Sequence, residues 1–449
     1  MRLARYCGKM SPRISSSQTD YPTALSCCST YQADLQSLAA NAASPLSRHF
    51  ALRLNVLRFA PIAWRLLFLF LKMEAQDAIV RCARATSMKS VTAVINLPAL
   101  VGNIAKIQSY VPQSKLIAVV KANAYGHGLI TVSQALEQDA HVHAFAVARL
   151  PEAMELREAG IKKPVVLLEG FLNAEDVPVI AEQGFFTAIH DIEQIEAIER
   201  TPINKPIHAW LKIDIGMHRL GASRDQVQEM KARLEQSSKI VQPIGLISHL
   251  SVADTPEQED YNREQIAYFN EVAKDFKGDL CLANSAGIIS WEDARTQFVR
   301  PGIIMYGISP YADKTGPDLG LQPVMTLKSS LIATRKLKKG DRVGYGAAWT
   351  APYDTILGIV AAGYGDGYPR TMPNGAPVLI NGRYVPTAGH VCMDMLFVDL
   401  GPDSTDKIGD EAILWGEGLP VEKIAALCGT IPYELVCRIM PRVNTEVQA

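Results

Sequence analysis

The sequence predicts an α/β protein, a (β/α)8 TIM-like barrel followed by a second, C-terminal antiparallel β domain. Between residues 114 and 302, short runs rich in β-branched residues recur eight times, and amphipathic stretches separate them. From Leu321 to Leu414, the pattern changes to alternating runs separated by turns that contain glycine. Of the 449 residues, 48% are apolar and 20% are charged, which is the balance of an ordinary globular protein.

The eight apolar runs are the predicted barrel strands. Most are continuously apolar, as expected for strands that are buried on both faces. Helix-prone stretches such as Pro151–Gly160 and Thr255–Phe276 lie between them, and strands that alternate with helices imply parallel βαβ units. The predicted strands are Lys115–Lys121, Ala144–Arg149, Pro164–Gly170, Phe185–His190, Ile207–Asp214, Ile244–Leu250, Cys281–Ser285 and Phe298–Gly302.

The later part of the chain has the signals of an antiparallel sheet. Asn381-Gly382 stands between two short apolar runs, which is the pattern of a tight hairpin. We therefore expect the barrel to occupy residues 88–320 and the β domain residues 321–449. The run 92–97 lies outside the eight barrel units and could add a strand to the β domain.

Residues 1–87 differ in composition from the rest of the chain. They carry eleven Lys and Arg, only four acidic residues and ten Ser. The apolar run from Val56 to Leu71 is interrupted by Arg58, Pro61 and Arg65, so it falls short of the ~20 mostly apolar residues that span a bilayer. A transit peptide would fit this composition. We favour a disordered extension, or one translated from an upstream start, with the functional chain beginning at Met88.

Charge and cysteine content exclude two classes of function. A net charge of −1 argues against a protein that neutralises a nucleic-acid backbone. The eight cysteines form neither a CxxC pair nor a cluster with zinc spacing, so we expect no metal site.

Polar residues stand at or near the end of each predicted barrel strand. The carboxyl ends of barrel strands converge on one face, where active sites of this fold lie. For Glu169 and His190 we favour the simpler explanation that polar residues mark where strands stop. The full set is Lys121, Arg149, Glu169, His190, Lys212, Asp214, His249, Asn284, Ser285 and Arg300.

Lys121 is the candidate nucleophile of this set. A lysine at the end of a buried strand loses hydration, which lowers the pKa of its amine and makes it nucleophilic. Such an amine can form a Schiff base with a carbonyl cofactor. Gly126 and Gly128 let the following backbone turn sharply. From the strand alone, the simpler interpretation is a lysine that only extends its amine out of the barrel into solvent.

The motif around this lysine resembles the pyridoxal 5'-phosphate (PLP) attachment segment of bacterial alanine racemases. The resemblance covers most of residues 88–449, and its motifs follow in the expected order and spacing. It is carried by Val119–Gly128, Lys212–Gly221, Ser248–Leu250, Asn284-Ser285, Val299–Gly307, Gly363–Tyr368 and Ala388–Met395. The family combines a PLP-binding barrel with a β domain, in agreement with the fold predicted above.

The resemblance implies two catalytic bases. Lys121 is expected to hold PLP covalently and to act as the base on the D-face of the substrate. Tyr364 is expected to be the base on the L-face, because racemisation needs one group to remove the Cα proton and another to return one. In the family this tyrosine comes from the other subunit and is hydrogen-bonded to the histidine that matches His249. The resemblance therefore implies a homodimer with shared active sites.

The remaining cofactor contacts also follow from the resemblance. Arg300 should face the pyridine nitrogen of PLP. Its guanidinium stays positively charged, so it does not favour protonation of the ring nitrogen as a carboxylate would. The phosphate should be held by Tyr125, Ser285 and the backbone near Gly302 and Ile303. His249 and Asn284 complete the expected cofactor-binding set.

The expected substrate contacts come from both domains. Arg219 and the Met393 backbone should bind the carboxylate of alanine, and Asp394 should line the same pocket. In this family Lys212 can be carbamylated, which would place a negative charge beside Arg219. We expect Cys392 to be a buried small hydrophobic residue rather than a nucleophile.

The resemblance implies a cytoplasmic enzyme that interconverts L-alanine and D-alanine and supplies D-alanine for peptidoglycan.

One departure concerns the pocket entrance, where many family members have a tyrosine near the C-terminus. That position falls at or near Pro441 here, so the strictness of the alanine preference stays open. The alternatives are a broader-specificity amino-acid racemase, a basic amino-acid decarboxylase and a non-catalytic PLP-binding protein.

Overall fold

The computed structural model describes residues 91–449. The chain divides into two compact units, Met1–Ser87 and Met88–Ala449. Our expectations for residues 1–87 therefore lie outside the described residues. Within the described part, none of the helices combines the length and the apolar character that crossing a membrane requires.

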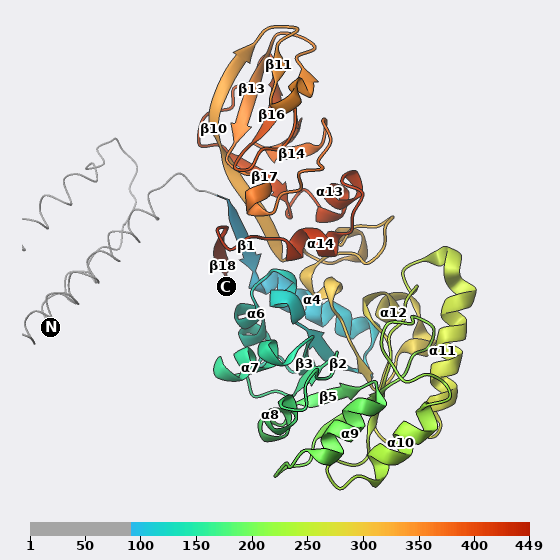
Figure 1. Ribbon diagram of the computed structural model, residues 1–449. Coiled ribbons are helices and arrows are strands. Elements are labelled where there is room, and N and C mark those ends of the chain that lie inside the picture. Colours follow the sequence, from blue (N-terminus) through green and yellow to red (C-terminus); the bar gives the residue numbers. More distant parts are fainter. Residues whose placement is uncertain (1–90) are drawn as a thin grey trace, which may run out of the picture. The chain divides into compact units, whose positions relative to one another are not determined.

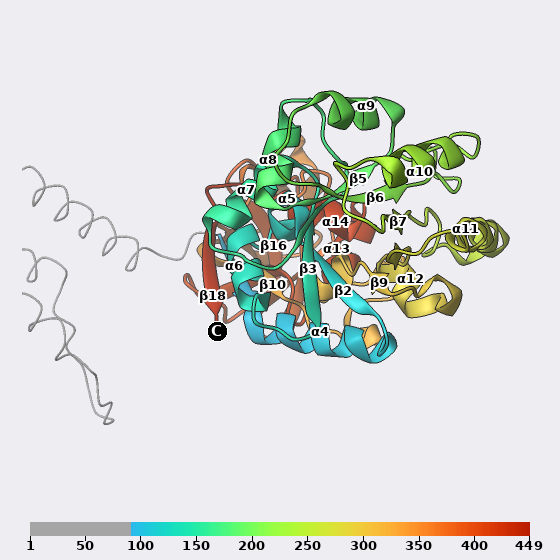
Figure 2. The same cartoon turned by 90° about the horizontal axis from the view of Figure 1, so that it is seen from below.

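Eight parallel strands close into a barrel, which confirms the predicted fold class. Each strand pairs in parallel with the next, and β9 returns to pair with β2. Figures 1 and 2 show the helices on the outside of these strands. The barrel strands are β2 (Lys115–Val119), β3 (Val142–Val147), β4 (Val165–Leu167), β5 (Phe186–Ile189), β6 (His208–Lys212), β7 (Gly245–Ile247), β8 (Leu280–Cys281) and β9 (Phe298–Val299).

The helices between these strands follow the predicted alternation. The expected helix Pro151–Gly160 corresponds to α7, and Thr255–Phe276 contains a short 3-10 turn, η4 (Pro256–Gln258), followed by α11. The barrel helices are α4 (Leu97–Tyr110), α5 (Lys121–Tyr125), α6 (Leu129–Leu136), α7 (Leu150–Glu158), α8 (Asp176–Gln183), α9 (Ile192–Arg200), α10 (Val227–Gln236), α11 (Glu259–Ala273) and α12 (Ser285–Ser290).

The β domain is built on one long strand, β10 (Met325–Leu337), which Figure 1 shows running through it. β10 pairs antiparallel with β1, β13 and β17, and β1 pairs in parallel with β18. The run near residue 92 thus lies in this sheet. The strands are β1 (Thr92–Asn96), β11 (Arg342–Val343), β12 (Trp349–Thr350), β13 (Thr355–Val360), β14 (Pro377–Ile380), β15 (Arg383–Pro386), β16 (Leu396–Gly401), β17 (Glu411–Trp415) and β18 (Asn444–Gln448).

The predicted hairpin at Asn381-Gly382 joins β14 to β15. Ile380 faces Arg383 in the antiparallel ladder, so the two residues between them form the whole loop. Both have positive φ angles, 50° at Asn381 and 75° at Gly382. This is the type I′ geometry that favours Asn-Gly, because it matches the twist of the flanking strands.

Two helices after β17 connect the β domain to the barrel. They are α13 (Val421–Leu427) and α14 (Pro432–Cys437). The buried Glu422 carboxylate of α13 accepts hydrogen bonds from the backbone N–H groups of Ser309, at 2.8 Å, and Gly316, at 2.7 Å. The hydrophobic core is continuous from the barrel into the β domain. The position of α13 beside the segment that follows the barrel is therefore fixed by both packing and hydrogen bonds.

Candidate active site

The turn after β2 has an unusual backbone, and we call residues 121–125 the lysine turn. Four consecutive residues without glycine, Ala122 to Tyr125, have φ between 52° and 55°. Each left-handed residue costs roughly 1–2 kcal/mol, so such a run persists only where its surroundings hold it. Leu129 N–H donates to Asn123 Oδ1 at 2.8 Å, and the His127 ring bonds the Tyr125 carbonyl at 2.8 Å. The turn sets Lys121 and Tyr125 at the carboxyl end of β2.

The amine of Lys121 lies in a cationic, poorly hydrated environment. Burial lowers its pKa below the usual value, and Arg219 and Arg300 act in the same direction, whereas Glu169 and Glu152 oppose them. A lowered pKa increases the fraction of free amine at neutral pH. Lys121 is therefore suited to nucleophilic attack and to proton transfer.

Lys212 and His249 share this environment. Lys212 is buried and donates from Nζ to the Leu168 carbonyl at 3.1 Å. Burial, helped by Arg300 and Arg219, lowers its pKa to about 8. Burial and Arg300 also hold the pKa of His249 well below its usual value, so its ring is neutral at pH 7. This concentration of positive charge would favour an anionic ligand at this end of the barrel.

Arg300 is fixed at the end of β9 by backbone acceptors. Its side chain is buried, and it donates to the carbonyls of Ser248 at 2.6 Å and Cys281 at 3.1 Å. Nη2 also lies 3.3 Å from Nδ1 of His249. Among the described residues, Nε of Arg300 has no hydrogen-bond partner. One donor of a rigidly held guanidinium thus remains available to a ligand.

Hydroxyl groups and backbone meet around Gly302. Ser285 Oγ accepts a hydrogen bond from the Gly302 N–H at 3.0 Å. A Cβ on Gly302 would lie 2.8 Å from Oη of Tyr125, so the close approach requires glycine. Burial raises the pKa of Tyr125 above its usual range, which keeps its phenol protonated as a donor. These donors, with the buried Ile303 beside them, form a cradle of the kind that holds phosphate oxygens.

Asn284 orients the serine of this cradle. Its Oδ1 accepts from the Gly287 N–H at 3.0 Å, which caps α12, and its Nδ2 donates to the Leu250 carbonyl at 3.1 Å. Asn284 therefore positions Ser285 rather than lying free in the cavity.

Arg219 is exposed on the loop that follows β6. The carboxylate of Asp214 holds this loop by accepting from the N–H groups of Gly216, at 2.9 Å, and His218, at 3.1 Å. Arg219 has no ion-pair partner within residues 91–449. Its charge still acts on Lys121, Lys212 and His249. It is thus a free cation beside the buried cluster.

The other expected site residues lie together on the β domain. Tyr364 N–H donates to the Cys392 carbonyl at 3.0 Å, and Gly365 N–H donates to the Met393 carbonyl at 2.8 Å. Arg442 pairs with Asp394 at 2.7 Å. The Tyr364 and Met393 side chains are 38% and 53% exposed, so this group presents an open surface.

The predicted site therefore falls into two groups within one chain. Ten of the residues are on the barrel or its loops, and three are on the β domain. In the part of the chain that the structure describes, no hydrogen bond or ion pair joins Tyr364, Met393 or Asp394 to the barrel group. That part also contains no cluster of three or more His, Cys, Asp or Glu side chains arranged to hold a metal ion.

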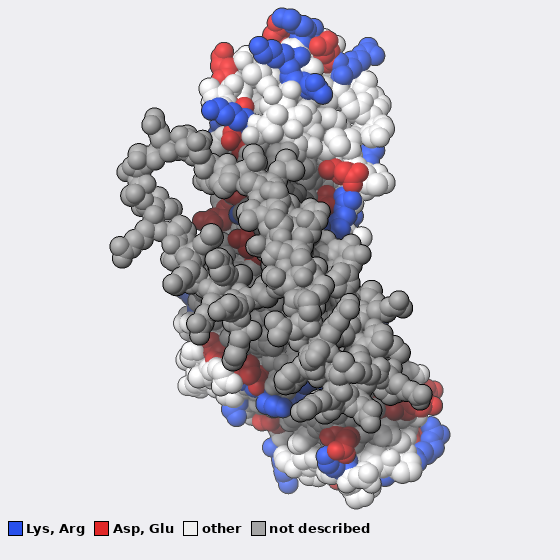
Figure 3. Space-filling view, turned by 90° about the vertical axis from the view of Figure 1, so that its left-hand side faces the viewer, with Lys and Arg blue, Asp and Glu red and all other residues white. Residues whose placement is uncertain are grey.

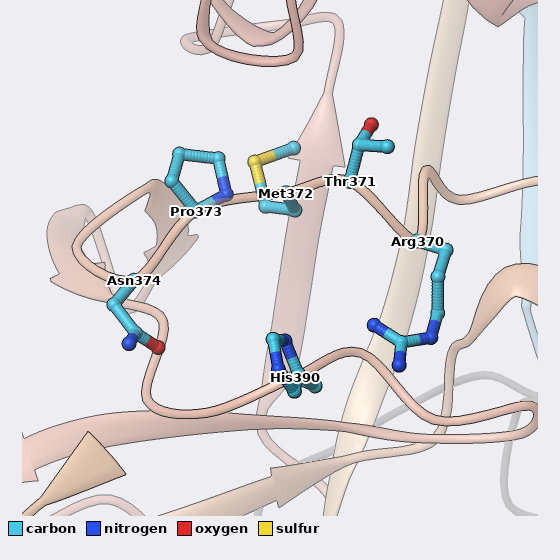
Figure 4. A pocket seen from close by; sticks show the side chains of 6 residues that line it. All are labelled: Arg370, Thr371, Met372, Pro373, Asn374 and His390. Carbon is cyan, nitrogen blue, oxygen red and sulfur yellow. The ribbon is translucent and has the colours of Figure 1, made fainter. Parts of the chain in front are cut away.

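A small hollow lies on the same loops of the β domain. Figure 4 shows its lining, which includes Arg370 from the loop after Tyr364 and His390 from the loop before Met393. Asn374 ties these loops together, because its Oδ1 accepts from the Gly389 N–H at 2.6 Å and its Nδ2 donates to the Ala348 carbonyl at 2.8 Å. The β-domain group is thus part of a connected set of loops.

Sequence reasoning missed three residues near these groups. Glu152 bonds the backbone of the lysine turn, and Cys437 of α14 lies close enough for the Lys121 charge to affect the pKa of its thiol. Neither belongs to a motif quoted above. Tyr345 is 71% exposed on a turn in which Gly344, Gly346 and Ala347 all have positive φ. An aromatic residue between two glycines was the signal that could have revealed it.

The fold and this site define the general class of the protein: an enzyme whose reactive groups gather at the carboxyl ends of the strands of a closed barrel. Residues 95–310 match the family described as "Alanine racemase, N-terminal domain", and residues 324–447 match "Alanine racemase, C-terminal domain". The chain belongs to the alanine racemase family. It is an amino-acid racemase, and thus an isomerase.

Individual relatives agree with this assignment. The chain is 52% identical over 359 residues to an alanine racemase of Aeromonas hydrophila, covering 80% of this chain and 99% of the relative. It is 50% identical to an alanine racemase of Vibrio parahaemolyticus with the same coverage. Among solved structures, the biosynthetic alanine racemase of Pseudomonas aeruginosa matches with a TM-score of 0.77 and 39% identity, covering 80% of this chain and all of that one.

Proposed function

We propose that this protein is an alanine racemase that interconverts L-alanine and D-alanine with PLP bound at Lys121. The observation that carries the proposal is the lysine turn, which sets a poorly hydrated amine and the Tyr125 hydroxyl on opposite ends of one rigid segment. The Ser285–Gly302 cradle lies directly beside Tyr125.

The residues present fit PLP. The aldehyde would be held by Lys121, and the phosphate by Tyr125, Ser285 and the backbone at Gly302 and Ile303. The free Nε of Arg300 would serve the pyridine nitrogen, and a permanent cation there leaves the ring unprotonated. When bound, PLP supplies an electron-withdrawing ring that delocalises the negative charge left on the substrate Cα.

Two bases on opposite faces would then move the Cα proton. Lys121 would serve the D-face, and its lowered pKa suits an amine that must both accept and return a proton. Tyr364 would serve the L-face, as the family resemblance implies. Because no hydrogen bond among the described residues joins Tyr364 to the barrel group of its own chain, we propose that it acts in the partner's site, within a homodimer.

Tyr345 is a second candidate for the L-face base. It is more exposed than Tyr364, at 71% against 38%, so its phenol is freer to enter a partner's barrel. Its turn also contains Ala347 at a φ of 51°, and strained backbone of this kind is concentrated at functional sites. In either case Nδ1 of the neutral His249 ring accepts from Arg300, so its Nε2–H can donate a hydrogen bond to the tyrosine oxygen and stabilise the phenolate.

Substrate recognition would rest on carboxylate binding. Arg219 and the Met393 backbone would hold the alanine carboxylate, with Asp394 on the wall of the same pocket. Lys212 has a pKa of about 8, so a useful fraction of its amine is neutral at physiological pH and open to carbamylation by carbon dioxide. The resulting anion would orient Arg219.

The proposed physiological role is cytoplasmic supply of D-alanine for peptidoglycan. A broader amino-acid racemase is the main alternative, because Pro441 offers no hydroxyl at or near the place of the usual entrance tyrosine. A panel of L-amino acids, each followed by chiral analysis of its product, separates the two. Racemisation of larger side chains at rates close to that of alanine would favour the broader enzyme.

The test is D-alanine formation from L-alanine by the full chain with PLP. Lys121→Ala removes the amine and should lose both the visible absorbance of the bound cofactor and all measurable racemisation. Arg149→Ala is a matched control, since Arg149 also follows a barrel strand but its side chain is 70% exposed. Full activity of the Lys121 variant would contradict the cofactor assignment.

A further inference from the structure

One carboxylate crosses from α7 to the lysine turn. Glu152 lies in the first turn of α7, and its Oε1 accepts a hydrogen bond from the backbone N–H of Ala122 at 2.7 Å. Its Oε2 accepts from the N–H groups of Ala148, at 2.8 Å, and Arg149, at 3.1 Å. One side chain therefore connects the residue after Lys121 to the end of the neighbouring strand β3.

This connection meets a need of the lysine turn. Ala122 is the first of the four left-handed residues, with a φ of 53°. The other end of the turn is secured by Asn123 and His127, whose bonds reach Leu129 and Tyr125. Only the Glu152 carboxylate bonds the Ala122 N–H among the described residues. Hydrogen bonds to a charged group contribute more than neutral ones, so this contact is a strong constraint.

We propose that Glu152 is a positioning residue for the reaction, which fixes the lysine turn so that Lys121 and Tyr125 hold their places at the barrel mouth. The inference rests on the proposed function, because it concerns the amine that would bind PLP. Glu152 makes no hydrogen bond to the amine or to the cradle among the described residues. Its charge raises the pKa of Lys121, and its hydrogen bond holds the backbone at Ala122. Its carboxylate also helps to begin α7 by satisfying N–H groups at the helix start.

The experiment uses Glu152→Gln with Glu155→Gln as its control. A glutamine side chain has one carbonyl oxygen, so it cannot accept on both sides as the carboxylate does. It would keep either the β3 contacts or the Ala122 contact, and lose the other. Glu155 lies one turn along α7, is exposed and has no side-chain hydrogen bond or ion pair among residues 91–449, so the same change there tests only the loss of a charge from this helix.

Three measurements separate positioning from a merely structural role. The first is PLP affinity of the apo chain by absorbance titration, which should fall about tenfold or more in Glu152→Gln and stay unchanged in Glu155→Gln. The second is amide hydrogen exchange of the peptide that contains Ala122, which should become faster only in Glu152→Gln. The third is the thermal unfolding midpoint, which reports on α7 and the fold as a whole.

The outcomes are distinct. A lower unfolding midpoint with unchanged PLP affinity and unchanged exchange at Ala122 would overturn the inference, since Glu152 would then serve only the fold. If Glu152→Gln fails to fold, Glu152→Asp takes its place, because the shorter carboxylate retains its charge but cannot span both sides. The unsubstituted chain is titrated with PLP in parallel. If it does not bind PLP, the proposed function itself is contradicted, independently of the role of Glu152.

Discussion

At the residue scale, burial next to other cations gives the site its chemistry. Lys121, Lys212 and His249 each lose affinity for protons first because they are poorly hydrated and then because Arg219 and Arg300 are near. Arginine stays charged under these conditions, so the pKa values of the lysines and the histidine are the ones that fall. The result is a group of nitrogen bases with lowered pKa values beside fixed positive charges, an environment that favours anionic ligands.

The pKa of Lys212 predicts a pH dependence of stability. Its folded pKa is about 8 against an ordinary value of 10.5, so the unfolded chain binds more protons between these values. The free energy of unfolding should therefore gain up to about 3 kcal/mol from this group as pH rises from 7 to 10. Lys212→Met should be more stable than the unsubstituted apo chain at pH 7 and should lack this gain.

Denaturant titrations at pH 7 and pH 10 measure the effect. Taking the difference between the variant and the unsubstituted chain removes the contribution of other titrating groups. Carbon dioxide is excluded from the buffers, because carbamylation would mask the amine. An identical pH response in both chains would show that the Lys212 amine is not buried as described.

At the element scale, the lysine turn is held between two neighbours. Glu152 of α7 bonds it from the barrel side, and α14 packs on it from the β-domain side. Tyr433 of α14 lies with its ring centroid 5.9 Å from that of Tyr125. A short segment with an unfavourable backbone thus keeps a single conformation because both neighbouring elements press against it.

Gly126 predicts how closely α14 must approach. It has a φ of 79°, and a Cβ built there would lie 1.9 Å from the carbonyl oxygen of Val436. Gly126→Ala should lower the free energy of unfolding by about 2–4 kcal/mol and weaken PLP binding, since either α14 or the turn must move. Gly160→Ala is the matched control, because Gly160 has a φ of 89° but nothing within 4 Å of its added Cβ.

Unfolding titrations of both variants isolate the packing contribution. The Gly160 change reports only the cost of the backbone angle, and the excess in Gly126→Ala reports the contact with α14. Equal losses in the two variants would mean that α14 does not lie against the turn in solution.

At the scale of the whole molecule, the candidate site residues of one chain lie in two groups. The barrel carries the lysine turn and the Ser285–Gly302 cradle, and the β domain exposes Tyr345, Tyr364, Met393 and Asp394. On the face seen in Figure 3, several basic side chains and a few acidic ones lie at one end of the molecule. Within the β domain, Lys338 pairs with Asp354 at 2.7 Å.

Subunit mixing tests the shared site. Lys121→Ala and Tyr364→Phe should each be nearly inactive alone, because general-base catalysis contributes about 10²–10⁴-fold. In a mixed dimer, one site carries both defects and the other carries neither. Mixed dimers should therefore recover up to about half the activity of the unsubstituted dimer, since one of two equivalent sites is intact.

The same mixing with Tyr345→Phe identifies the tyrosine. The true L-face base is the one whose loss nearly abolishes racemisation but leaves PLP binding intact, and whose variant complements Lys121→Ala. If verified mixed dimers recover no activity with the Tyr364 variant and none with the Tyr345 variant, the shared-site proposal is wrong.

Deletion of residues 1–87 tests the domain organisation. The distinct composition of this stretch, and family matches that begin at residue 95, lead us to expect an active protein. Its kcat/KM for alanine and its unfolding midpoint should equal those of the full chain. Failure of the shortened chain to fold or to bind PLP would show that the extension contributes to structure.

The sequence by itself determined the barrel, the β domain and the grouping of the candidate site residues at the barrel strand ends. Buried parallel strands have to be apolar throughout, and the polar residues at their ends are easy to find for that reason. The Asn-Gly hairpin was equally predictable from the sequence, because its turn requires positive φ angles that few residue pairs adopt. Lys121, Arg300 and the Ser285–Gly302 pair could all be named because each stands at a strand end.

Only the tertiary structure decided which residues support those groups. Glu152 and α14 contact the lysine turn, and these contacts join positions 30 or more residues apart. Local sequence patterns do not predict contacts between positions so far apart. The same holds for the separation of Tyr364 and Tyr345 from the barrel group, because exposure depends on what the rest of the chain covers. Local residue preferences determine elements, whereas packing between distant elements determines which side chains are buried, strained or left open.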